Sequence, residues 1–166
     1  MMHKLLSRLK QDRRGTATIE LALYAPMLAM LTIGTIDMSN AFSRKLACEQ
    51  AVQRAIEKVM QTTGVLDVSE TIVNEVADQA NIPEEEKATK IAVTYSLECD
   101  DEAPQTSGDA ATFDTFTCPP GTVSSSRYIE VQVNEVYDPM FPLHFGAYDG
   151  EKGGYPIKAT AGMRTQ

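Results

Sequence analysis

Few residues in this sequence of 166 residues have types and spacing suited to chemistry. The chain has two histidines, His3 and His144, which are too isolated to predict a metal site with other ligands. No glycine-rich phosphate loop and no nucleophile elbow is present. The acidic run Asp100-Asp101-Glu102 could attract calcium, but it lacks the spacing of a calcium-binding loop. We therefore expect no enzymatic activity, no metal and no cofactor.

One carboxylate has an unusual position. Glu20 lies five residues after Gly15, at the start of a long apolar run. A carboxylate carried into hydrocarbon costs about 2.5–3.5 kcal/mol on insertion scales, so such a group usually has a partner. Two interpretations are open: Glu20 acquires a positively charged partner, or its side chain snorkels toward the nearby headgroups because it lies only one turn into the helix.

The apolar run that must position Glu20 is long enough to cross a membrane. Residues 21–36 carry no charge, and with residues 16–20 they form 21 residues before Asp37. At 1.5 Å per residue this length is roughly 30 Å, the thickness of one hydrocarbon core. Pro26 removes one helical hydrogen bond within the run and frees the carbonyl of Ala22, which predicts a kink.

The charges are divided unequally around this run. Residues 1–15 contain five basic and one acidic residue, a net charge of +4, whereas the remainder contains 10 basic and 22 acidic residues, a net charge of −12. The positive-inside rule predicts a cytoplasmic N-terminus and an exported C-terminal part. Because the part of the chain after residue 15 is strongly acidic, it would repel the phosphate backbone of nucleic acids, which argues against nucleic-acid binding.

Two simpler interpretations of the apolar run stay open. It could be an uncleaved signal anchor, or a secretory signal cut after the small residues Ser39-Asn40-Ala41. A secretory signal is disfavoured because the run is longer than its usual apolar core and because Glu20 lies within its start. The pair Arg13-Arg14 could indicate twin-arginine export, but the residues after it do not support this.

The helical pattern continues beyond Asp37. Polar residues alternate with an apolar stripe, and Gly64 is the first strong stop signal. One helix from about residue 16 to residue 61 would be roughly 70 Å long, with its second half packed on a soluble domain. The stripe expected to make that contact comprises Phe42, Leu46, Val52, Ile56, Val59 and Met60, with Ala51 and Ala55 filling in between them.

The exported part has the patterns of an α+β domain. Asp67 begins a capping box, and the apolar stripe after it predicts a short helix over residues 68–80. Alternating apolar residues predict strands over 91–97, 128–137 and 155–163. Residues 100–126 are expected to form a loop. We therefore predict a long N-terminal helix packed on an antiparallel sheet of three to four strands plus a short helix.

The cysteines are consistent with export. Cys99 ends one predicted strand and Cys118 lies in the following loop, so a disulfide between them would close a ring worth about 3 kcal/mol in the chain-entropy model. An oxidising periplasm permits it, whereas two free thiols would require a cytosolic domain. Cys48 lies on an apolar helix face, where a small buried hydrophobic side chain is expected.

The N-terminal segment resembles that of a known family. This segment is similar to the N-terminal segment of the TadE-like minor pseudopilins of Tad (Flp) pilus systems. The similarity lies in the stretch RRGTATIELALYAPMLAML, followed by GTIDMSNAF. Gly15, Glu20, Pro26 and Asp37 match, in order, the family's glycine, glutamate, mid-run proline and distal acidic residue. The chain departs from the pattern at Leu21, where Tad pilins often have an aromatic residue.

The resemblance implies a processing site and a pairing site. A membrane prepilin peptidase would cut after Gly15, remove the leader 1–15 and expose an ammonium group on Thr16. Glu20 would then pair with the ammonium group of a neighbouring subunit, so that its charge sets register. The implied division of the chain is leader 1–15, helix 16–64 with a transmembrane first half, and periplasmic domain 65–166.

The resemblance also implies partners and a location. They are other pilins and pseudopilins, the prepilin peptidase and the inner-membrane assembly platform, with the protein in the inner membrane or incorporated in the pilus. A mature body of about 151 residues is long for a major Tad pilin, which favours a minor component. Two other classes stay open: an uncleaved, membrane-anchored periplasmic binding or adhesion module, and, with no catalytic constellation to support it, an exported hydrolase.

Overall fold

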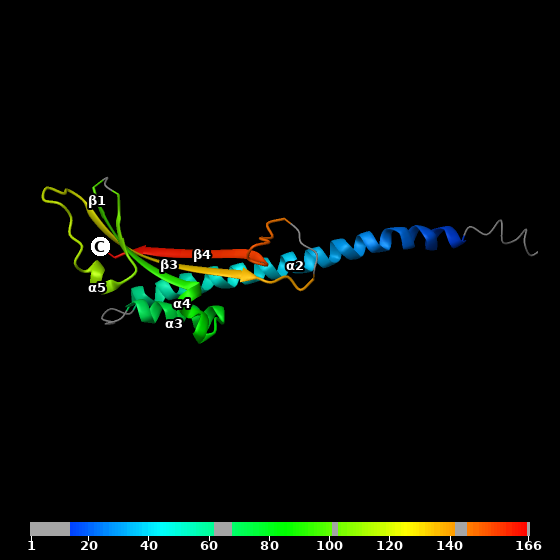
Figure 1. Cartoon of the computed structure of the whole chain (residues 1–166), viewed down its shortest axis with the longest axis horizontal. Coiled ribbons are helices and arrows are strands. Elements are labelled where there is room, and N and C mark those ends of the chain that lie inside the picture. The colour runs from blue at the N-terminus through cyan, green and yellow to red at the C-terminus, as the bar shows by residue number, and fades with distance from the viewer. Residues whose placement is uncertain (1–13, 62–67, 101–102, 142–145, 166) are drawn as a thin grey trace, which may run out of the picture.

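The computed structural model describes residues 14–61, 68–100, 103–141 and 146–165. Its dominant element is helix α2, Arg14–Gln61, which is 48 residues long. The first part of α2 projects alone, and the other elements gather around its second part (Figure 1). The predicted long helix is therefore confirmed, and Gly64, the expected stop signal, lies outside the described residues.

Two further helical regions follow. Helix α3, Val68–Ala80, buries Ile72, Val76, Ala77 and Ala80, which recur at helical spacing. Asn81 adopts a left-handed conformation with φ 51°, and the N–H of Ile82 bonds to the carbonyl of Ala77 at 2.9 Å, so the helix ends there. A 3-10 turn η1, Glu84–Glu86, and helix α4, Lys87–Lys90, then lead into the sheet. The helix predicted over 68–80 is confirmed, whereas Asp67 lies outside the described residues.

The sheet has four antiparallel strands in the order β2-β1-β3-β4. Strand β1 is Ile91–Cys99, β3 is Ser125–Tyr137 and β4 is Tyr155–Arg164, which confirms the three strands predicted from alternation. Register places Val93 opposite Val131 and Ile91 opposite Val133, so apolar side chains share one face. Full burial of a valine such as Val131 stabilises the fold by roughly 1.5–3 kcal/mol.

The expectation that residues 100–126 form a loop was wrong in part. This segment contains strand β2, Gln105–Ser107, and the one-turn helix α5, Ala110–Phe113, and β3 already begins at Ser125. Asp109 caps α5 by accepting a hydrogen bond from the N–H of Thr112 at 2.9 Å. Both elements are too short for periodicity to reveal them.

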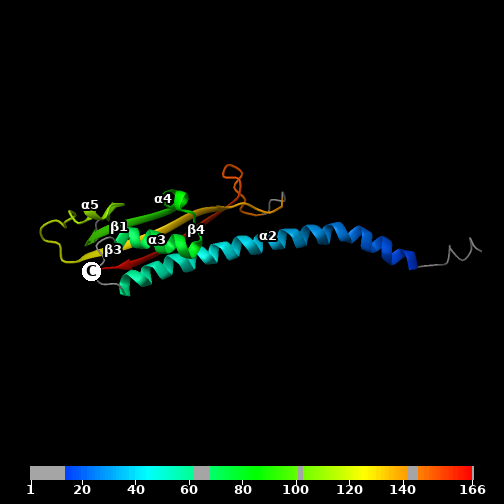
Figure 2. The same ribbon diagram turned by 90° about the horizontal axis from the view of Figure 1, so that it is seen from below.

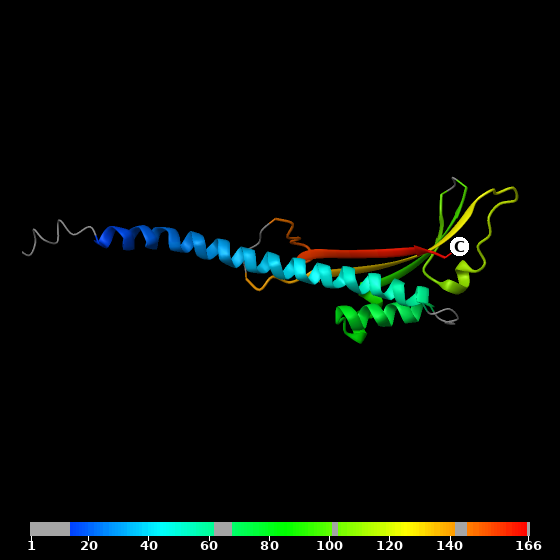
Figure 3. The same ribbon diagram turned by 180° about the vertical axis from the view of Figure 1, so that it is seen from behind.

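Helices α2 and α3 cover the same face of the sheet, α2 beneath β3 and β4 and α3 beneath β1 (Figure 3). The alternating burial of β1 and β4 leaves their outward side chains exposed. The core therefore lies between one sheet face and two helices, and the second half of α2 is one wall of it.

The prediction of which α2 residues face the core was wrong at three positions. Phe42, Leu46 and Met60 are 54–58% exposed. The prediction is confirmed at Ala51, Val52, Ala55 and Ile56, which are buried, and with Ala41 and Cys48 they form a row of mostly small residues. Small side chains let the helix axis approach the sheet and α3 closely, and this contact sets the rotation of α2.

Candidate functional site

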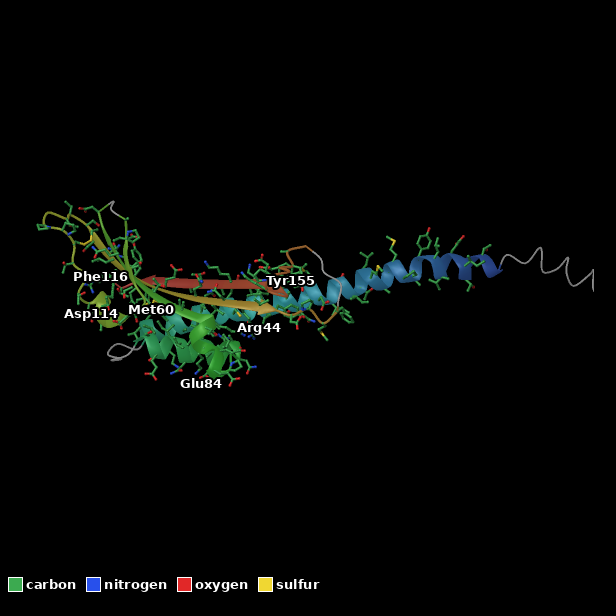
Figure 4. The ribbon with its side chains drawn as sticks, in the orientation of Figure 1. Arg44, Met60, Glu84, Asp114, Phe116 and Tyr155 are labelled. Carbon is green, nitrogen blue, oxygen red and sulfur yellow. A yellow bond between two sulfur atoms is a disulfide. The ribbon has the colours of Figure 1, made fainter. Side chains whose placement is uncertain are left out.

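Most of the large exposed apolar side chains of the described chain lie on the first half of α2. Residues 15–32 are all exposed, including Ile19 at 71% and Leu23 at 73%. Side chains project from this part of the ribbon with no other element packed against them (Figure 4). Among the described residues, α2 is one helix long and apolar enough to cross a membrane, judged by length and composition. A single-pass anchor accounts for so much exposed apolar surface.

The residues of the expected processing site lie at the tip of this helix. Gly15, Thr16 and Glu20 are all exposed within its first two turns. A Cβ built on Gly15 would meet no atom of another described element within 4 Å, so packing among the described residues does not require the glycine. Thr16 and Glu20 are four residues apart and lie on one side of α2. Pairing between subunits stays a prediction.

Pro26 lies inside α2, which continues through it as one helix. The first part of α2, drawn in blue, leaves the line of the rest in Figure 2, and Pro26 belongs to this part. A kink at the proline itself stays a prediction.

Asp37 marks the end of the exposed segment and is buried, with 1% of its surface exposed. Its Oδ1 accepts a hydrogen bond from the N–H of Met140 at 2.9 Å, and its Oδ2 accepts one from the N–H of Phe141 at 3.2 Å. The connection between β3 and β4, drawn in orange, lies beside α2 at this level (Figure 2). Asp37 thus fastens a loop more than 100 positions away in sequence to the point where α2 leaves the domain.

A second polar contact fastens α2 to the sheet and to α3. Arg44 donates to both carboxylate oxygens of Glu135, at 2.7 and 3.0 Å, and to the carbonyl of Ala80 at 2.6 Å. Lys90 reaches the same carboxylate at 3.2 Å. The partners of Arg44 come from distant elements that only the fold brings together.

The charges of Arg44, Lys90 and Glu135 shift the pKa values of the groups in this contact. Burial of Glu135 would raise the pKa of its carboxyl, but hydrogen bonds from Arg44 and Lys90 and their positive charges outweigh burial and lower that pKa. Burial and the neighbouring Glu135 carboxylate raise the pKa of the Cys48 thiol to about 11. The thiol donates to Glu135 at 3.5 Å, so Cys48 is buried, as expected, but is also a polar contact.

The far end of the domain is held by a disulfide. Cys99 and Cys118 are bonded, with their Cα atoms 5.6 Å apart, as the sequence analysis predicted. Phe113 of α5 packs beneath this region against Tyr95, with ring centroids 5.3 Å apart, and Arg127 lies over the Phe113 ring. The disulfide and this aromatic cluster attach the segment between β1 and β3 to the sheet.

Metal-ligating side chains do not gather in the described part of the chain, where no three His, Cys, Asp or Glu residues form a group that could hold an ion. His3, His144, Asp101 and Glu102 lie outside the described residues. The features that point to a function are therefore the uncovered helix, the glycine and glutamate at its tip, and the polar contacts at its base.

Comparison with known families matches this same segment. Residues 15–56 match the family model described as TadE-like protein, which confirms the resemblance drawn from the sequence. The match covers most of α2 and includes Gly15, Glu20, Pro26 and Asp37. Comparison with curated proteins and with solved structures finds no significant match.

Proposed function

From the TadE-like character of residues 15–56, we propose that this chain is a minor pseudopilin that takes part in the assembly or initiation of a Tad pilus. The observation that carries the proposal is a single 48-residue helix. Its first half is bare, meaning that no other element covers the exposed residues 15–32, and its second half is a wall of an α+β core. A helix of this kind suits a subunit that is stored in the membrane and then packs with similar helices.

Orientation and processing follow from the ends of the bare segment. The basic residues 1–15 remain in the cytoplasm, and the domain after Asp37 lies in the periplasm. A prepilin peptidase cuts after Gly15, which is exposed and has open space around its Cα. Removal of the leader leaves Thr16 as the new N-terminus beside the membrane.

Assembly supplies the partner of Glu20. The new ammonium group on Thr16 of one subunit pairs with the Glu20 carboxylate of a neighbour, so that two buried charges neutralise each other. The pairing specifies how far one helix is displaced along the next. The other interpretation, that Glu20 snorkels to the headgroups, predicts no dependence of assembly on its charge.

Exposed apolar residues beyond the membrane boundary support contacts with other subunits. Phe42 and Leu46 lie one turn apart on α2 and are 58% and 54% exposed, although they follow Asp37. A helix that served only as an anchor would need no apolar side chains on its outer face there. Neighbouring pilin helices would cover them.

N-terminal sequencing of the mature protein from its native membrane tests the proposal. A chain beginning at Thr16 supports a pseudopilin. One beginning at Met1 or Met2 indicates an uncleaved membrane-anchored binding or adhesion module, and one beginning at Phe42 indicates a secreted protein. Either of the last two outcomes overturns the proposal.

A further inference from the structure

The start of the β3–β4 connection is held against α2 by its backbone, and the Met140 side chain remains largely exposed. Met140 and Phe141 donate their N–H groups to Asp37, and Asn40 reaches the Met140 sulfur at 3.6 Å. The returning end of the same connection also lies near α2, because a Cβ on Gly146 would lie 3.9 Å from Met38 Cε. Both ends of the connection are therefore placed at one level of the helix.

That level is the boundary of the bilayer if α2 spans the membrane, a premise taken from the proposed function. Asp37 follows the uncharged run 21–36, and residues 16–36 span roughly 30 Å as a helix, one hydrocarbon thickness. The Asp37 carboxylate is buried beneath the loop, so it does not face lipid. The loop is consequently fixed where acyl chains meet headgroups on the exported side.

The side chains at this level suit an interface rather than bulk water. Met140 is 71% exposed, and Ile36, one residue before Asp37, is 44% exposed. Residues 139–148 contain no Asp, Glu, Lys or Arg, and the nearest acidic residues, the exposed Asp138 and the half-buried Asp149, lie just outside this stretch. Met140 and Phe141 can therefore contact a membrane without carrying a charge into it, while Asp138 remains at the level of the headgroups and water.

We propose that residues 139–141 form a second membrane contact, in which Met140 inserts among the acyl chains just below the headgroups of the outer leaflet. Asp37 is the positioning residue, because its two hydrogen bonds fix the depth of the loop. The domain then rests on the bilayer at two points, α2 and this loop, instead of turning freely about one helix.

The absence of tryptophan from the sequence provides a clean probe. Met140→Trp in the full-length protein, reconstituted in phosphatidylcholine–phosphatidylglycerol vesicles, introduces one fluorophore at an exposed position. Quenching is compared between lipids that carry a spin label near the headgroup and lipids labelled near the end of the acyl chain. We expect quenching by the shallow label to be about twofold stronger or more, as for a side chain at the interface.

Two further single tryptophans separate this inference from the anchor itself. Leu28→Trp, within the bare helix, should be quenched most by the deep label. Val123→Trp, 95% exposed and beside Asp100 at the opposite end of β1, should not be quenched. If Leu28→Trp is quenched but Met140→Trp is not, the loop contact is refuted and the anchor stands. If Leu28→Trp is not quenched, the membrane-spanning helix fails and the loop contact fails with it.

The role of Asp37 is tested in the Met140→Trp background. Asp37→Ala removes both acceptors and should weaken quenching by the shallow label. Asp37→Asn keeps one acceptor, so its quenching should lie between that of the Met140→Trp protein with Asp37 intact and that of the Asp37→Ala variant. Asp109→Ala, which removes the cap of α5 far from the loop, is the matched control and should leave quenching unchanged. Circular dichroism verifies that each variant is folded. Unchanged quenching in a folded Asp37→Ala variant would refute the positioning role.

Discussion

Arg44 and Glu135 lie 91 positions apart in sequence and meet as a two-pronged ion pair, with Arg44 Nε 2.7 Å from one carboxylate oxygen and Nη2 3.0 Å from the other. Because Arg44 also donates to Ala80, one side chain joins α2, β3 and the end of α3. Figure 4 places Arg44 where α2 passes beneath the sheet. The bare half of α2 is thus attached to its domain through a charged contact as well as an apolar one.

Loss of this carboxylate should destabilise the domain. Glu135→Ala leaves Arg44 and Lys90 without their shared acceptor in a half-buried place, and we expect a loss of about 2 kcal/mol in the free energy of unfolding. Chemical denaturation of the detergent-solubilised protein, followed by circular dichroism, measures it. Glu49→Ala breaks only the exposed pair with Lys45 and should cost less than about 0.5 kcal/mol. Equal effects of the two substitutions would contradict the importance of the cluster.

The same carboxylate should make stability depend on acid pH. The folded-state pKa of Glu135 is lower than in the unfolded chain, so the folded protein binds fewer protons in acid. Its contribution is fully present above the unfolded-state pKa of glutamate and is lost as the pH falls through the folded-state value. Unfolding free energies of the wild type and Glu135→Gln, measured from neutral pH into acid, should converge. A constant difference would show that Glu135 is not the titrating group.

Cys48 should resist alkylation in the folded protein. With its pKa raised to about 11, its thiolate fraction at pH 8 is roughly one hundredth that of an ordinary cysteine, and burial slows the reaction further. Without reductant, mass spectrometry should find a label on Cys48 only after denaturation and none on Cys99 or Cys118. Rapid labelling of Cys48 in native protein would contradict its burial.

Gly15→Val should block processing without affecting the fold. The added side chain has open space within this chain, so any effect arises at the peptidase, whose site would have to accept a branched residue at the scissile bond. The precursor should accumulate in the membrane and pili should decrease, as shown by gel mobility and N-terminal sequencing. Gly150→Val, where a Cβ also has open space, is the matched control. Normal cleavage of the Gly15 variant would exclude this processing site.

Glu20→Gln should impair assembly with other subunits without impairing insertion into the membrane. The amide keeps the shape of the side chain and lowers the cost of burial, so membrane level should be maintained or increased. Cleavage should largely persist, whereas co-purification with other pilin-like subunits and pilus formation should fall. Glu57→Gln, at an exposed position of the second half of α2, is the matched control and should change none of these. Normal partner recovery and normal pili with Glu20→Gln would favour the snorkelling interpretation.

Local patterns were sufficient for the longer helices and strands, whereas the candidate processing site came from the family resemblance and stays a prediction. The long uncharged run, the alternation in β1, β3 and β4, and the helical spacing of α3 each depend on neighbours within a few residues, which periodicity records directly. Gly15, Glu20, Pro26 and Asp37 were singled out by their resemblance to the TadE-like pattern, and the match of residues 15–56 to that family confirms the resemblance. The three-residue strand β2 and the single turn of α5 escaped because they contain too few residues to show a period.

Tertiary structure alone decided which side of α2 meets the core and what its polar residues do. Apolar character favoured Phe42 and Leu46 as well as Ala51 and Ala55 for the buried face. Close packing buries the small residues and leaves Phe42 and Leu46 exposed, since small side chains allow the helix to approach the sheet. Met140, a partner of Asp37, lies 103 positions away, and Glu135, a partner of Arg44, lies 91 positions away, and nothing local to either residue identifies them. A buried charge is stable only beside its donors or acceptors, and the fold is what brings those together.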